Sequence, residues 1–184
     1  MKAYNKLNTE IIMNFYADEI CEKLNVKKSR IFKRVRDREL TDIRAMVCYL
    51  TKLKFSKAKL QDIADFFCQK HTTVKHSIKK IKDLKPIDAK INKVVNHCES
   101  LDFEDAILLR NGFIECENGG VYEFRNEEVL VKFEKEHHFL YYYNKDNNGN
   151  FIKSYHVGNI DVIDVIILSQ NSAPLTLIFS LLKN

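Results

Sequence analysis

The stretch QKHTTVKHSIKKI, residues 69–81, places the strongest constraint on how this chain can fold. Val74, Ile78 and Ile81 recur at the i, i+4, i+7 spacing of one helical stripe, whereas the lysines around them fall largely off that stripe. The segment therefore predicts a helix that packs through one face and exposes a basic second face. Its first turn, Lys70 to Thr73, carries polar side chains that can hydrogen-bond to base edges or phosphates in a groove.

The segments before this helix complete a candidate helix-turn-helix. Glu39 to Leu53 and Lys57 to Phe67 keep apolar residues at helical spacing, and Ser56 is the expected N-cap of the second segment. Cys68, Gln69 and Lys70 form the turn that follows. In such motifs the second helix contacts bases through its N-terminal residues. The competing interpretation is a helical hairpin that only packs on its neighbours.

A dense basic run lies upstream of these helices. A first helix is expected from an N-cap at Asn8 or Thr9 to about Asn25. Val26 to Arg38, VKKSRIFKRVRDR, then holds seven lysines and arginines. Positive charges this closely spaced repel one another unless an anion lies nearby. A solvated surface is the competing interpretation. Beside a helix-turn-helix, however, the run predicts contact with phosphates or a minor groove.

Charge divides the chain into two halves. Residues 1–88 hold 21 Lys and Arg against 11 Asp and Glu, a net charge of +10, whereas residues 89–184 hold 9 against 14, a net charge of −5. The first half therefore predicts a polyanionic partner, and the second argues against a chain that coats nucleic acid along its whole length. We expect a cytoplasmic protein, because the apolar run near Val162 to Leu168 is too short to span a bilayer and no apolar signal region opens the chain. Five cysteines without a C-x-x-C pair indicate reduced, mostly buried thiols.

The second half changes from helical to strand patterns. Pro86 marks a boundary, and Ile87 to Arg110 is expected in helical or helix-break-helix form. From Phe113 onward, alternating residues and the Asn118-Gly119 turn predict an antiparallel meander. The expected strands are 113–116, 121–124, 129–134, 139–143 and 151–157, followed by a closing helix capped by Asn159 or Asp161 through Ile167, and by either a helix or an edge strand over 175–182.

The predicted fold class is therefore α+β. Residues 1–86 form an all-α helix-turn-helix domain, 87–100 a helical linker, and 101–184 a small acidic domain with an antiparallel sheet. The linker and domain boundaries follow from Pro86 and from the change in pattern.

Three groups in the second half invite a chemical interpretation. His137, His138 and His156 suggest a metal site, but adjacent strand residues point to opposite faces, which disfavours a shared ion. A solvated sheet face is favoured over a nuclease-type cluster for the acids Glu115, Glu117, Glu123, Glu127 and Glu128. The aromatic run Tyr141 to Tyr143, with Phe139 and Tyr155, fits either a sheet core or stacking of single-stranded bases, and the negative net charge favours the core.

The first half resembles a known family. RDRELTDIRAMVCYL (36–50), LQDIADFF (60–67) and KHTTVKHSIKKI (70–81) are similar to the C-terminal DNA-binding domain of the bacterial replication initiator DnaA, with similarity over about residues 8–84. The resemblance implies that Arg38 or Arg36 enters a minor groove, that His71 and Thr72 contact major-groove bases, and that Thr73 lies near the backbone. The family's usual Gly-Gly-Arg-Asp turn is shortened here to Cys68-Gln69-Lys70, and Lys70 donates hydrogen bonds where that aspartate accepts them.

These observations predict a non-enzymatic, sequence-preferring protein that binds double-stranded DNA. The chain lacks a G-x-x-x-x-G-K-[ST] phosphate loop, so no nucleotide or other cofactor is expected, and neither is a membrane partner. The resemblance implies a free-standing module of the kind found in phage and mobile-element proteins, acting in replication or transcription. A protein partner or self-association is expected through residues 101–184. The competing hypotheses are a DNA-processing enzyme with a metal-dependent acidic domain and a protein-interaction module.

The predicted DNA-binding residues share positive charge or a polar first-turn position. They are Arg30, Arg34, Arg36, Arg38, Lys70, His71, Thr72, Thr73 and Lys75.

Overall fold

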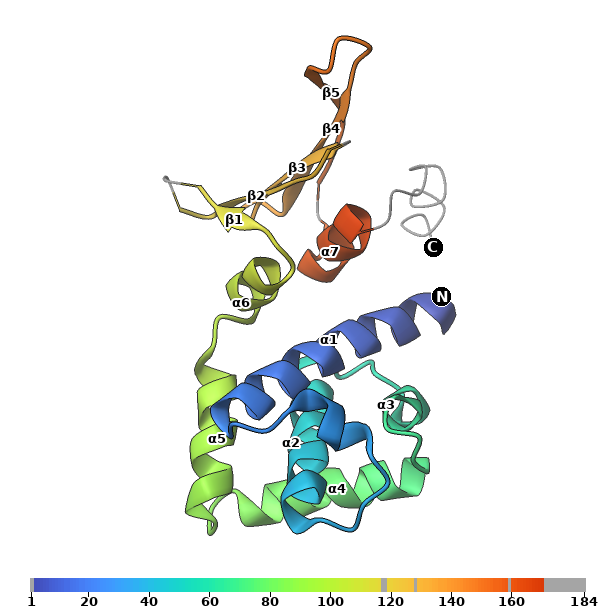
Figure 1. The fold of residues 1–184 in the computed structure, drawn as a ribbon, viewed down its shortest axis with the longest axis vertical. Coiled ribbons are helices and arrows are strands. Elements are labelled where there is room, and N and C mark those ends of the chain that lie inside the picture. Colours follow the sequence, from blue (N-terminus) through green and yellow to red (C-terminus); the bar gives the residue numbers. More distant parts are fainter. Residues whose placement is uncertain (1, 117–118, 128, 159, 171–184) are drawn as a thin grey trace. The chain divides into compact units, whose positions relative to one another are not determined.

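The computed structural model describes residues 2–116, 119–127, 129–158 and 160–170. The chain divides into two compact units, Met1–Leu101 and Asp102–Asn184. The first is helical and the second is built on an antiparallel sheet (Figure 1). The predicted α+β fold class is confirmed.

The first unit is a bundle of helices around one core. Its elements are α1 (Lys2–Lys23), the 3-10 helix η1 (Lys28–Phe32), α2 (Arg38–Lys54), α3 (Leu60–Phe66), α4 (His71–Leu84) and α5 (Ala89–Ser100). Helix α2 packs against both α1 and α4. Its Ile43 and Val47 are fully buried and meet the apolar stripes of those neighbours. The core therefore forms around α2.

Two helix starts differ from the sequence prediction. Helix α1 begins at Lys2, so Asn8 and Thr9 are not caps but buried side chains inside the helix. Helix α3 begins at Leu60, and its N-cap is Lys59 instead of Ser56. The chain makes a turn before α3, in which the Lys52 ammonium binds the carbonyl oxygens of Ser56 and Ala58. Tertiary contacts thus outweigh the local capping signals at both positions.

Helix α5 belongs to the first unit, although the sequence predicted a linker over 87–100. It packs on α1 and α2, and Ile91, Val94 and Val95 are buried there. The apolar spacing of these residues completes the helical core, which explains why the segment does not act as a spacer. The predicted helix-break-helix form is confirmed, since α6 (Phe103–Arg110) follows after Leu101 and Asp102.

The second unit contains a five-stranded antiparallel sheet in the order β1-β2-β3-β4-β5, which confirms the predicted meander. The strands are β1 (Ile114–Glu115), β2 (Val121–Arg125), β3 (Val129–Glu134), β4 (Phe139–Lys145) and β5 (Phe151–Val157). Register is fixed by alternation. Val131 pairs with Phe124 on one side and Tyr142 on the other, and a bulge interrupts the β4–β5 pairing at Tyr142 and Tyr143.

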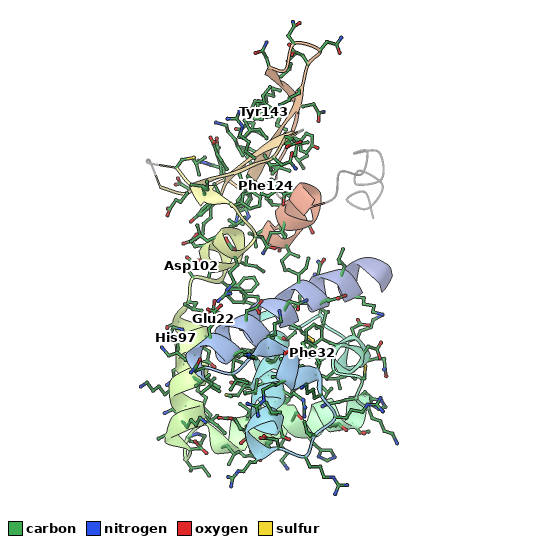
Figure 2. All side chains as sticks on the ribbon, in the orientation of Figure 1. Glu22, Phe32, His97, Asp102, Phe124 and Tyr143 are labelled. Atoms are coloured by element: carbon green, nitrogen blue, oxygen red, sulfur yellow. The ribbon has the colours of Figure 1, made fainter. Side chains whose placement is uncertain are left out.

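One face of this sheet carries the core of the second unit. Tyr122, Phe133 and Leu140 are buried on it. Helix α6 lies near β1, and α7 (Val162–Gln170) packs on β3. The Tyr122 hydroxyl donates a 2.6 Å hydrogen bond to Asp105 of α6. The ring of Phe124, labelled in Figure 2, lies 5.4 Å from the Phe113 ring at an interplanar angle of 41°. These contacts tie α6 to the buried face.

The remaining predictions divide between described and undescribed residues. Cysteines are free thiols, with Cys21, Cys48 and Cys98 buried, as expected, while Cys68 is exposed. Asp161 accepts a hydrogen bond from the Ile163 amide, the predicted cap of α7. No described helix has both the length and the apolar character needed to cross a membrane. Predictions that fall outside the described ranges concern Glu117, Asn118 of the predicted Asn118-Gly119 turn, Glu128, Asn159 and the predicted element over 175–182.

Asp164 in α7 gives the second unit a pH-sensitive feature. Its side chain is 9% exposed, Oδ1 has no hydrogen-bond partner among the described residues, and burial raises the pKa of the carboxyl to about 6. Because the unfolded value is lower, about 3.9, ionisation of Asp164 destabilises the folded unit above pH 6, and the penalty disappears as the pH falls towards 4.

We therefore expect Asp164→Asn to raise the free energy of unfolding by about 1–2 kcal/mol at pH 7.5 and to change it little at about pH 3.5, below the unfolded pKa. Urea unfolding of the variant and the parent at both pH values measures this. An equal effect at the two pH values would contradict the origin of the penalty in ionisation.

Candidate nucleic-acid interface

Helix α4 packs through one face and exposes the other, as its sequence predicts. Val74 and Ile81 are fully buried and Ile78 is half-buried, while Thr72, Thr73 and Lys75 are exposed. His71 is the first residue of the helix and is also exposed. Figure 2 shows nitrogen-tipped side chains projecting along α4. The polar first turn is thus available to a ligand.

Helix α3 ends in a tight turn before α4, and backbone hydrogen bonds close this turn. The Gln69 amide donates to the Ala64 carbonyl at 2.9 Å, and the Cys68 amide donates to Asp65 at 3.0 Å. This is the Schellman pattern, which needs a left-handed residue after the C-cap. Cys68 fills that position with φ +51°, where glycine is usual. The shortened turn therefore keeps the geometry that starts a second helix immediately.

The N-terminus of α4 has no side-chain cap from Lys70. Lys70 is the N-cap residue, in extended conformation, and its side chain makes no capping hydrogen bond. An ammonium cannot cap, since it only donates and the first-turn amides need an acceptor. The positive end of the helix dipole and the Lys70 charge therefore lie together, an arrangement that favours an anion such as a phosphate.

The basic loop, defined here as residues 33–37, connects η1 to α2. Its first end is held by η1, where Ile31 is fully buried and the Phe32 ring lies 5.3 Å from Phe66 and 5.8 Å from Phe67 (Figure 2). Those two rings end α3, directly before the turn to α4. The start of the basic loop is therefore fixed near the start of α4.

The second end of the basic loop is fixed to the middle of α4. Asp37 caps α2 by accepting a hydrogen bond from the Leu40 amide. One turn further, Asp42 binds Lys80 of α4 at 2.5 Å and lies 4.0 Å from the Arg38 guanidinium. The basic loop is thus held at one end by the rings that end α3, and it leads at the other end into α2, whose Asp42 binds Lys80 of α4.

Arg44 of α2 holds the backbone at the start of the basic loop through hydrogen bonds, a role that could not be predicted from the sequence. Its Nε donates to the Ile31 carbonyl at 2.6 Å and its Nη2 donates to the Lys33 carbonyl at 2.5 Å. Hydrogen bonds from a charged donor are among the stronger ones in proteins. The signal available in the sequence was a single arginine on an otherwise apolar helix face, which does not reveal a partner on another element.

The predicted DNA-binding residues gather in this region to different degrees. Arg34 and Arg36 are exposed on the basic loop, and Arg38 is 89% exposed at the start of α2. Arg30 lies in η1, with its guanidinium 3.6 Å from Asp37. Lys80, in contrast, is held by Asp42 and is less available to a ligand. The first unit thus exposes positive charge at two places, the basic loop and the start of α4 at Lys70.

The geometry of α3, the closed turn and α4 is that of a helix-turn-helix, and the comparison with family models decides its type. Residues 17–81 match the model described as bacterial dnaA protein helix-turn-helix. The match confirms the predicted resemblance and supports DNA binding through the dnaA-type helix-turn-helix. It ends within α4 and includes no residue of the second unit. No curated protein and no solved structure matches the chain.

The candidate chemical groups of the second unit lie apart from one another. His137 and His138 fall in the turn between β3 and β4 instead of on a strand, and His156 stacks on Tyr141. Glu123 pairs with Lys132. Within the described ranges, His, Cys, Asp and Glu side chains form no group of three or more that could hold a metal ion.

Arg44 is expected to act on DNA binding without touching DNA. Arg44→Ala removes the hydrogen bonds to the Ile31 carbonyl of η1 and the Lys33 carbonyl of the basic loop. The loop must then be ordered when the duplex binds, and we expect about fivefold to tenfold weaker duplex binding. Fluorescence anisotropy with a labelled duplex measures the affinity, and amide hydrogen exchange reports the loop. Lys57→Ala is the control, since it removes one positive charge from an exposed turn. Equal effects of the two substitutions would contradict the supporting role.

Lys70 is expected to strengthen duplex binding while it lowers the free energy of unfolding. Lys70→Ser supplies an acceptor for the α4 amides and removes the charge, so we expect a gain of about 1 kcal/mol in the free energy of unfolding together with weaker duplex binding. Lys70→Ala removes the charge without supplying a cap, and should weaken binding with no gain in stability. Thermal unfolding and anisotropy on both variants measure the two effects. A stabilised Lys70→Ser protein that binds duplex as tightly as the parent would exclude a phosphate contact.

Proposed function

We propose that this protein is a non-catalytic, sequence-preferring binder of double-stranded DNA. In this proposal the first turn of α4 enters the major groove, where His71 and Thr72 contact base edges and Thr73 lies near the backbone. Arg36 or Arg38 enters the adjacent minor groove, where negative potential attracts arginine. Arg30, Arg34, Lys70 and Lys75 contact phosphates.

The observation that carries the proposal is that the segments flanking the basic loop are anchored to the helices of the helix-turn-helix. Phe32, before the loop, contacts the end of α3, and Asp42 of α2, after the loop, binds Lys80 of α4. A groove-binding helix and a cationic loop that is anchored to the same unit can contact neighbouring grooves at once. The match of residues 17–81 to the dnaA-type helix-turn-helix supports the same activity.

We further propose that the chain regulates replication or transcription of a phage or mobile element, as a free-standing module. The second unit contributes an interaction of its own, either with a protein partner or with another copy of the chain. The separation of the chain into two compact units supports this division of labour.

Replacing the base-contacting pair should separate specificity from affinity. The His71→Ala, Thr72→Ala variant keeps the cations, so we expect the dependence of log affinity on log salt to stay as steep as in the parent. Discrimination between a selected site and an unrelated duplex should fall by about tenfold or more, because each good base contact contributes about 1–3 kcal/mol. Equal losses on both duplexes would contradict the base-contacting role.

The measurement is anisotropy with both duplexes at several salt concentrations. Incubation of supercoiled plasmid with Mg²⁺ or Mn²⁺ serves as a companion assay, since a non-catalytic binder leaves the plasmid intact. Nicking of the plasmid would favour the competing enzyme hypothesis.

A further inference from the structure

The face of the sheet opposite the core is rich in half-exposed aromatic rings. Tyr142 of β4 is buried, and its neighbours Tyr141 and Tyr143 point to the other face, as alternation along a strand requires. Both are half-buried on that face, which we call the open face. The run of three tyrosines therefore supplies one core residue and two surface rings.

Cations are interleaved with these rings across the strands. Tyr141 is directly opposite Lys132 of β3, and Tyr143 is directly opposite Lys153 of β5. Lys145 is opposite Phe151 at the end of the same strand pair. Residues directly opposite in an antiparallel pair share a face, so rings and cations alternate over the open face.

The cations lie over the rings at close distance. Lys153 Nζ is 4.3 Å from the centre of the Tyr141 ring, and Arg125 Cζ is 4.8 Å from the centre of the Phe151 ring. Lys145 Nζ lies 5.5 Å from the same Phe151 ring. These cation–π contacts hold positive groups beside flat apolar surfaces. A ligand with a flat ring and a nearby negative charge would satisfy both at once.

The overall negative charge of this half of the chain does not extend to the open face. Described cations on it are Arg125, Lys132, Lys145 and Lys153, against the carboxylates Glu123 and Glu134. Because Lys132 is paired with Glu123, the cations left for a ligand are Arg125, Lys145 and Lys153. Other acids of this unit lie at α6 instead: Asp102 caps the helix, and Glu104 and Asp105 are in its first turn. Asp102 and Asp105 each bind Lys135 at 2.7 Å. The local charge is therefore compatible with an anion, contrary to what the net charge suggested.

From this arrangement we infer that the open face binds single-stranded DNA. Tyr141 and Tyr143 stand two residues apart, about 6.8 Å along β4, which is about twice the 3.4 Å step of a duplex strand. Each ring therefore receives a separate, unstacked base, which at Tyr141 displaces the stacked His156 ring, while Arg125, Lys145 and Lys153 contact phosphates. A duplex cannot use this surface, because its bases are already stacked. A second copy is disfavoured, because two-fold symmetry would bring the same cations face to face.

Single-strand binding by the open face is additional to the proposed duplex binding and uses other residues. An experiment can therefore refute either proposal without refuting the other. Binding of labelled oligothymidine is measured by anisotropy with the full chain. All proteins carry His71→Ala, Thr72→Ala and Lys70→Ala, which reduces the contribution of the first unit. In that background we compare Tyr141→Ala, Tyr143→Ala with Tyr141→Phe, Tyr143→Phe. Ile152→Ala is the control, an exposed apolar residue on β5 that pairs with Asn144 and lies off the open face.

The alanine pair should weaken oligothymidine binding by about tenfold to a hundredfold, whereas the phenylalanine pair and Ile152→Ala should bind like the background protein. In the otherwise unmutated chain, the alanine pair should leave duplex affinity unchanged. Lys153→Glu, which keeps both tyrosines, should also weaken oligothymidine binding and covers the case in which the alanine pair does not fold.

Three results would overturn the inference. The first is oligothymidine binding that neither the alanine pair nor Lys153→Glu weakens. The second is tyrosine-dependent binding of oligouridine RNA that is clearly tighter than that of oligothymidine, which would assign the face to RNA. The third is tyrosine-dependent dimerisation in sedimentation, without oligonucleotide binding, which would assign the face to a second copy.

Discussion

The burial of α4 against α2 is the constraint on which the rest of the first unit depends. Val74 and Ile81 contribute no exposed surface, so the rotation of α4 about its axis is fixed. Each such side chain contributes roughly 1.5–3 kcal/mol when it leaves water. With that face committed, the first-turn residues His71 and Thr72 and the lysines of the helix must face outward. The core therefore determines which side chains a ligand meets.

The same packing creates the position of the basic loop. Loops with few buried contacts are usually the most mobile parts of a unit. Here the chain on either side of the loop is anchored by Ile31 and by the Asp37 cap of α2, and Arg44 holds two backbone carbonyls between them. The backbone that carries the mutually repelling cations is thus held in place before an anion binds. Less conformational entropy is therefore lost when the loop binds a ligand. In the second unit, the alternation of side chains along β4 places Tyr142 in the core and Tyr141 and Tyr143 on the opposite face.

Much of this organisation could be predicted from periodicity, because stripes such as Val74, Ile78 and Ile81 and the alternation in β3 and β4 directly record which face is buried. Helix starts were less predictable. Asn8, Thr9 and Ser56 carry local capping signals that packing overrides, and α5 was taken for a linker because Pro86 looks like a domain boundary. The partners of Arg44 and Asp42 could not be predicted, since they lie on other elements. Net charge is too coarse to describe a single surface, because it averages the acids at α6 with the cations of the open face.

The most direct test of the central claim is selection from a random pool of duplexes with the purified full chain at near-physiological salt. The account predicts enrichment of one defined site. That site should differ from the box of the replication initiator at the position nearest Lys70, where a donor replaces the family's acceptor. Recovery of duplexes with no enriched sequence would contradict base recognition by α4, and recovery of no duplex at all would contradict DNA binding by the first unit.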